Sequence, residues 1–162
     1  MMPTIRELKQ QPSLKTVVLS TGQHGDLLAP IYQYFDVFPD YDFHLMHPGQ
    51  TLTELTASIL KAVEPILQKE TPDIVLIHGE TATAFAVTLA CYYRQIPVGH
   101  VVAGLRTYNL QSPFPEEYFR QAIDSMATYY FAPTETAVRN LRKEGKNPST
   151  VFFTGNTVVD AM

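Results

Sequence analysis

Short apolar runs suited to buried strands alternate with longer helical segments along most of this chain. The run Asp73–His78 is followed by the Ala-rich segment Thr81–Arg94 and then by a second apolar run at Val98–Val102. Strands that are apolar on both sides need cover on both faces of the sheet, and intervening helices supply it. The alternation therefore predicts an α/β fold with a doubly wound, Rossmann-like parallel sheet. A length of 162 residues fits one domain, residues 1–162.

The other elements follow from the same periodicities and from the turn residues between them. Further strands are expected at Lys15–Thr21, Phe43–Met46, Tyr129–Ala132 and Val151–Thr154, and further helices at Pro3–Gln10, Asp26–Tyr34, Thr51–Glu70, Glu116–Ala127, Thr134–Glu144 and from Thr157 to Met162. Doubly wound domains usually begin with a strand, whereas this chain begins with a helix, so the usual first strand is expected to be missing. Its two neighbours, Lys15–Thr21 and Asp73–His78, would then pair directly or keep unpaired backbone groups.

Composition excludes several classes of protein. The formal net charge is -4, which argues against binding to a nucleic-acid backbone. Cys91 is the only cysteine, so no intrachain disulfide forms, and a reducing cytoplasm is the expected compartment. The first residues carry charges and no apolar run, so we expect no signal peptide, and no stretch is long enough for a membrane span.

Glycines and polar residues follow four of the expected strands at the point where each strand ends. They are Gly22–Asp26, Gly79–Thr83, Ala103–Thr107 with Ser112–Glu117, and Gly155–Thr157. Ligands of parallel sheets bind at the carboxyl ends of the strands, where helix N-termini offer unpaired N–H groups. The pattern predicts a cleft for an anionic ligand at this edge.

These residues also have structural interpretations. Glu80 or Thr81 could cap a helix as readily as serve a ligand. Glu116 and Glu117 lie at a helix start, where carboxylates favour the helix dipole, and taken alone a structural role is their stronger interpretation. Arg106 is the better functional candidate, because a guanidinium binds an anion through two hydrogen bonds.

Generic motifs and the histidines add little. No G-x-G-x-x-G and no Walker loop occurs in the chain. His78 and His100 lie at strand ends, where a single histidine more often packs than reacts.

The combination of motifs is more specific than any one of them. Eight occur in a fixed order: Thr21-Gly-Gln-His24, His47-Pro-Gly-Gln-Thr-Leu52, Asp73-Ile-Val-Leu-Ile-His-Gly79, Pro97-Val-Gly-His-Val101, Ala103-Gly-Leu-Arg-Thr107, Ser112-Pro-Phe-Pro-Glu-Glu117, Ala132-Pro-Thr-Glu135 and Thr154-Gly-Asn-Thr157. Together they resemble the non-hydrolysing UDP-N-acetylglucosamine 2-epimerases, from about Met2 to Met162.

The resemblance implies an architecture and an activity. Members of that family have two Rossmann-like domains in the GT-B arrangement, and this chain would be the N-terminal one. They interconvert UDP-GlcNAc and UDP-ManNAc by eliminating UDP and adding it back, without a metal or a nicotinamide, so no cofactor is expected. They dimerise through their N-terminal domains, and a homodimer is expected here. The ligand would be UDP-GlcNAc or UDP.

The family's site residues map onto particular positions of this chain. Of its three carboxylates, two correspond to Glu80 and Glu116, whereas the third is replaced by Val102, which cannot transfer a proton. Substrate-binding positions would be Arg106, Glu117, Gly79, Thr81 and Asn156, and a second nucleotide-sugar site would include Gln23, His24 and Gln50.

Three hypotheses for activity follow from what the chain lacks relative to that pattern. The family's first strand with its Gly-Thr-Arg-Pro-Glu turn is absent, as is the second domain, which carries a catalytic histidine and most contacts to UDP. The leading hypothesis is an epimerase segment that is inactive alone. The alternatives are one half of a split enzyme, completed by a separate C-terminal domain, and a non-catalytic nucleotide-sugar or regulatory module that docks on an epimerase. A neighbouring gene for the missing half would favour the split enzyme.

Overall fold

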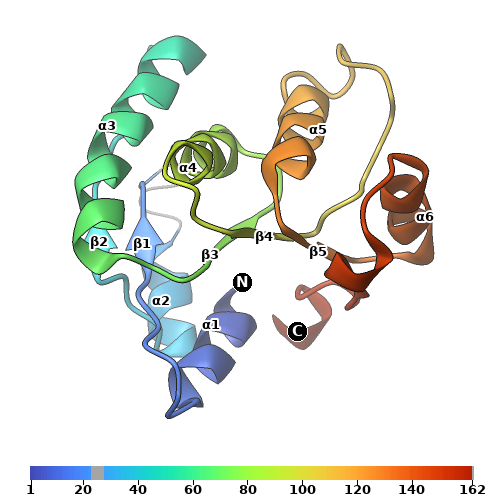
Figure 1. Cartoon of the computed structure of the whole chain (residues 1–162). Helices are drawn as coiled ribbons and strands as arrows, with labels where there is room; N and C mark the ends of the chain where they lie inside the picture. The colour runs from blue at the N-terminus through green and yellow to red at the C-terminus, as the bar shows by residue number, and fades with distance from the viewer. Residues whose placement is uncertain (23–27, 162) are drawn as a thin grey trace. The chain divides into compact units, whose positions relative to one another are not determined.

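The computed structural model describes residues 1–22 and 28–161, shown in Figure 1. Contacts divide the chain into two compact units, Met1–Thr51 with Thr157–Met162, and Leu52–Asn156. The single domain over residues 1–162 stays a prediction.

The first unit holds a two-stranded parallel sheet. Its elements are α1 (Met2–Gln10), β1 (Leu19–Ser20), α2 (Ala29–Phe35), β2 (Tyr41–Asp42) and the 3-10 turn η3 (Val159–Ala161). In this sheet Leu19 is paired with Tyr41 and Ser20 with Asp42.

Both predicted strands of this unit are corrected by the structure. Strand β1 covers only the end of the expected Lys15–Thr21, and β2 lies before the expected Phe43–Met46. His44 has φ 45, in the left-handed region, so the extended backbone of β2 cannot continue through it. The expected helix from Thr157 is only the short η3 turn within the described residues.

The second unit confirms the predicted alternation. Its elements are α3 (Leu52–Glu70), β3 (Val75–His78), α4 (Ala82–Tyr93), β4 (Val98–Val101), α5 (Glu116–Met126), β5 (Tyr129–Ala132), α6 (Glu135–Lys143), η2 (Pro148–Thr150) and β6 (Val151–Phe153). The four strands form one parallel sheet in the order β3-β4-β5-β6. The predicted α/β class with parallel sheets is therefore confirmed.

The two apolar runs, Lys15–Thr21 and Asp73–His78, lie in different units of the structure. Strand β1 hydrogen-bonds with β2, whereas β3 hydrogen-bonds with β4, so the runs belong to different sheets. Direct pairing and unpaired backbone groups, the two alternatives set out from the sequence, both stay predictions.

Helical periodicity accounts for the packing of the second unit. Along α3, Leu55, Ile59, Val63 and Leu67 recur every four residues and are all buried. This stripe packs on the Ala-rich α4, and Figure 1 shows α3, α4 and α5 side by side along the sheet. Small alanines in α4 allow the close approach that dense cores require. None of the described helices is both long and apolar enough to cross a membrane.

Candidate functional site

The turn after β3 carries the first candidate residues. Gly79 has φ +68, a conformation that glycine adopts without strain. Thr81 caps α4, since its hydroxyl accepts the N–H of Ala84 at 3.2 Å. Glu80 lies between them, half-buried, so the turn presents one carboxylate beside a helix N-terminus.

Arg120 of α5 joins two of the predicted carboxylates. Its Nη2 donates to Oε1 of Glu80 at 2.9 Å, and its Nη1 lies 3.5 Å from Oε2 of Glu117. The Arg120 side chain is only 9% exposed, and its Nε has no hydrogen-bond partner among the described residues. The structure therefore brings Glu80 and Glu117 onto one buried guanidinium.

The two adjacent glutamates of α5 differ in their environment. Glu117 is completely buried, and its carboxylate accepts the N–H groups of Thr107 at 3.0 Å and Tyr108 at 2.9 Å, and the amide of Gln121 at 2.7 Å. Glu116 is half-buried, and its side chain has no hydrogen bond or ion pair to residues 1–22 or 28–161. Glu117 therefore fixes the loop before α5, and Glu116 is the glutamate of the pair that is free to meet a ligand.

The backbone is strained at Val102, where the resemblance implies a carboxylate. Val102 directly follows β4 and has φ 70, a region that β-branched residues rarely occupy. Its N–H and that of Ala103 both donate to the carbonyl of Phe131, at 3.0 and 3.1 Å. The backbone is thus held in place around a side chain that has no proton to give.

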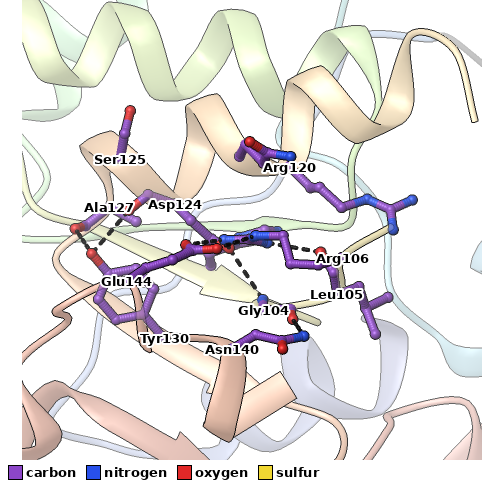
Figure 2. Close-up of polar contacts among 12 residues, drawn as sticks. Gly104, Leu105, Arg106, Arg120, Asp124, Ser125, Ala127, Tyr130, Asn140 and Glu144 are labelled. Carbon is purple, nitrogen blue, oxygen red and sulfur yellow. Dashed lines mark hydrogen bonds and ion pairs between the residues drawn. The ribbon is translucent and has the colours of Figure 1, made fainter. Parts of the chain in front are cut away.

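The buried side chain of Arg106 forms ion pairs with Asp124 and Glu144. Its Nε and Nη2 donate to the two carboxylate oxygens of Glu144, each at 2.7 Å, and Nη2 is also 2.8 Å from Asp124 (Figure 2). The side chain is 0% exposed. An anion would have to replace Glu144 to reach this guanidinium, so anion binding by Arg106 stays a prediction.

The remaining predicted residues lie at the far edge of the sheet, in the other unit or outside the described residues. Asn156 is exposed and follows β6, at the opposite edge of the sheet from β3. Gln50 belongs to the first unit, where its side-chain oxygen accepts the N–H of His47 at 3.3 Å. Gln23 and His24 lie outside the described residues.

Sequence reasoning missed one charged residue of the core, Asp124. It is fully buried, and it accepts hydrogen bonds from His100 and from the N–H of Gly104. A signal was present in the sequence, because Glu117, Arg120 and Asp124 recur at helical spacing on the face of α5 that its apolar residues turn to the core. Polar residues at core positions usually have specific partners.

Electrostatic interactions favour the ionised forms of both buried carboxyl groups. Burial alone would raise the pKa of Asp124, but the hydrogen bond and charge of His100 and the charge of Arg106 hold it below the ordinary value. Burial opposes ionisation of Glu117 too, and hydrogen bonds from Gln121, Thr107 and Tyr108 lower its pKa. The described residues contain no group of three or more potential metal ligands.

Comparison with known proteins places this geometry in a family. A family model described as UDP-N-acetylglucosamine 2-epimerase matches residues 6–162. The chain belongs to the UDP-N-acetylglucosamine 2-epimerase family. The resemblance seen in the sequence motifs is thereby confirmed.

Curated members of the family match the chain over its whole length. A probable UDP-N-acetylglucosamine 2-epimerase of Ralstonia solanacearum is 49% identical over 162 residues, and the UDP-N-acetylglucosamine 2-epimerase of Escherichia coli K12 is 47% identical. The match covers 100% of this chain but 43% of each relative. The chain therefore spans less than half the length of these epimerases.

Solved structures of the family share the fold. The UDP-GlcNAc 2-epimerase of Neisseria meningitidis bound to UDP-GlcNAc matches 99% of this chain with a TM-score of 0.96 and 43% identity. The Methanocaldococcus jannaschii enzyme in complex with UDP-GlcNAc and UDP matches 99% with a TM-score of 0.90 and 35% identity. The chain covers 43% and 44% of these structures. The chain thus has the fold of one part of these GT-B epimerases.

Proposed function

We propose that this chain forms the nucleotide-sugar half of a UDP-N-acetylglucosamine 2-epimerase and that it does not epimerise UDP-GlcNAc by itself. The observation that carries the proposal is Glu80, held by Arg120 at the carboxyl end of β3 in a chain of this family. Solved relatives named with UDP-GlcNAc or UDP bound support a nucleotide sugar as the ligand.

The proposed reaction assigns different tasks to the carboxylates. Epimerisation at C2 requires a base that removes the C2 proton while UDP leaves C1. UDP then returns to C1 with its original configuration, and a proton is delivered to C2 on the opposite face. Glu80 would be the base on one face, since Arg120 holds its carboxylate at 2.9 Å at the carboxyl end of β3. Glu116 would be a second proton-transfer group. Val102 stands where the family has its third carboxylate and can move no proton, so turnover should fail.

Catalytic silence is tested in deuterated water. The purified chain is incubated with UDP-GlcNAc, and the anomeric and C2 protons are followed by NMR, with the full-length E. coli relative as positive control. We expect no UDP-ManNAc and no deuterium at C2. Either product from the chain alone would contradict the proposal. Activity that appears only after adding the C-terminal part of the E. coli enzyme would favour the split-enzyme alternative.

We further propose that two copies associate through a groove between α3 and the start of α5. Its lining is almost entirely apolar, and Phe114 and Tyr118 on its rim remain 65% and 50% exposed. The groove has a volume of about 500 Å³ and is lined by Leu52, Thr53, Thr56, Ala57, Leu60, Phe114, Pro115, Tyr118 and Phe119. Exposed apolar patches of this kind mark interaction sites. Two-fold dimers, in which identical faces pair, are the commonest homo-oligomers.

Self-association is measured by light scattering after gel filtration at decreasing protein concentration. The wild type should show twice the chain mass of 18.2 kDa. Phe114→Asp should shift it towards the monomer, because a charge would then be buried in the apolar groove. Tyr34→Asp, which alters an aromatic residue of α2 that is 78% exposed, is the matched control and should leave the dimer intact. A monomer at every concentration would refute the proposal.

A further inference from the structure

A buried charged network centres on Asp124 and includes Arg106 and Glu144 (Figure 2). Oδ1 of Asp124 accepts from Nδ1 of His100 at 2.6 Å, and Oδ2 accepts from the N–H of Gly104 at 3.1 Å. Nη2 of Arg106 lies 2.8 Å from the same Oδ2. The side chains of Asp124, His100 and Arg106 are all 0% exposed. One carboxylate therefore holds three donors out of contact with water.

One arm of this network reaches the turn that carries Glu80. The second ring nitrogen of His100, Nε2, lies 3.1 Å from the carbonyl of Gly79, the residue before Glu80. A carbonyl and a carboxylate can only accept, so both contacts are hydrogen bonds when the ring of His100 carries two protons. His100 thus ties the Gly79 turn to α5.

The other arm fixes the loop after β4. The guanidinium of Arg106 is shared between Asp124 and Glu144, whose side chain is 30% exposed at the end of α6. The carbonyl of Gly104 accepts from the side-chain amide of Asn140 at 3.0 Å. Gly104 is therefore held through both its N–H and its carbonyl.

We propose that Asp124 is a positioning residue that sets the Glu80 turn and the Arg106 loop relative to each other. The proposal rests on the proposed function, since it makes Asp124 support the nucleotide-sugar edge. Charge-assisted hydrogen bonds inside a dry site have narrow geometry, and groups around a reactive centre must be held within about 0.5 Å. Asp124 touches no ligand itself and acts through His100, Gly104 and Arg106.

Three variants test the contacts to the Gly79 turn and to the Arg106 loop separately. Backbone amide NMR signals and amide hydrogen exchange are compared over the whole chain. Asp124→Asn keeps the shape but removes the charge, so we expect shifted signals both at Gly79–Thr81 and at Gly104–Arg106, with exchange at Gly104 at least tenfold faster. His100→Gln should act mainly on Gly79–Thr81. Glu144→Gln should act mainly on Gly104–Arg106. Ile123→Val is the control: it shortens a fully buried apolar side chain of the same helix, removes no hydrogen bond of the network and should move neither turn.

The pattern of responses decides the proposal. Equal changes in both turns from His100→Gln and from Glu144→Gln would overturn it, as would an Asp124→Asn response matching that of Ile123→Val. If Asp124→Asn does not fold, the other two variants still test the separate arms. Titration with UDP-GlcNAc is a further readout, with at least fivefold weaker binding expected for Asp124→Asn. Absence of binding to the wild type would contradict the proposed function, while the amide signals would still judge the positioning role.

Discussion

The Gly104→Ala variant is expected to lose about 2–5 kcal/mol of its free energy of unfolding. Gly104 has φ +84, where an alanine is strained, and an added Cβ would lie 2.5 Å from the carbonyl oxygen of Ala137 and 2.9 Å from the side chain of Leu141. The first of these is backbone of α6, which cannot give way locally. Urea denaturation followed by circular dichroism measures the loss.

Gly145→Ala is the matched control for this variant. Gly145 also has a positive φ, +77, but a Cβ there meets nothing within 4 Å. Only the backbone strain remains, so we expect a loss of about 1–2 kcal/mol. Equal losses from the two variants would show that the close approach of α6 to Gly104 does not limit stability.

Replacing Glu117 with alanine is expected to cost about 3 kcal/mol of the free energy of unfolding. The change strips the N–H groups of Thr107 and Tyr108 of their acceptor and leaves the buried Arg120 with Glu80 as its only carboxylate. Glu116→Ala is the control, because the neighbouring side chain has no such partners among the described residues, and surface-like changes cost within about 0.5 kcal/mol. A similar cost for both would contradict the structural role given to Glu117.

The pH dependence of unfolding provides a second test of the same carboxylate. A carboxyl group with a lowered pKa in the folded chain stabilises it above the unfolded value and loses that contribution as pH falls through the folded pKa. For Glu117, whose ordinary value is 4.5, stability should be full above about pH 4.5 and should fall below it. Glu117→Gln should reduce this loss of stability at low pH, and the loss that remains should come from Asp124.

Periodicity and strand chemistry were enough to predict most of the second unit. The apolar stripe of α3 and the two threonine caps, Thr81 and Thr134, are local signals, and the helices begin where these residues predict. The first unit was predicted less well. The limits of β1 and β2 are set by two residue pairs between the strands and by the left-handed backbone at His44, and no local sequence pattern reveals either.

The candidate site was predictable in its residues but not in their pairings. The sequence pointed to Glu80, Glu116 and Glu117, yet only the fold shows that Glu117 is used by the loop and that Glu116 is not. Asp124 and His100 are separated by 24 residues and Arg106 and Glu144 by 38, so no local spacing reveals their contact. Arg106 in its glycine-rich loop suggested an anion site. In the structure its guanidinium is paired with the carboxylates of Asp124 and Glu144.

Titration of the ¹⁵N-labelled chain with UDP-GlcNAc tests the central claim most directly, because it reports both affinity and place of binding. We expect a dissociation constant of about 1 mM, because one half of a two-sided cleft leaves most of the ligand in water. The shifts should gather at Gly79, Glu80, Thr81 and Glu116, and Glu80→Gln should weaken them without unfolding the chain. Micromolar binding, or shifts that avoid the Gly79–Thr81 turn, would contradict this account.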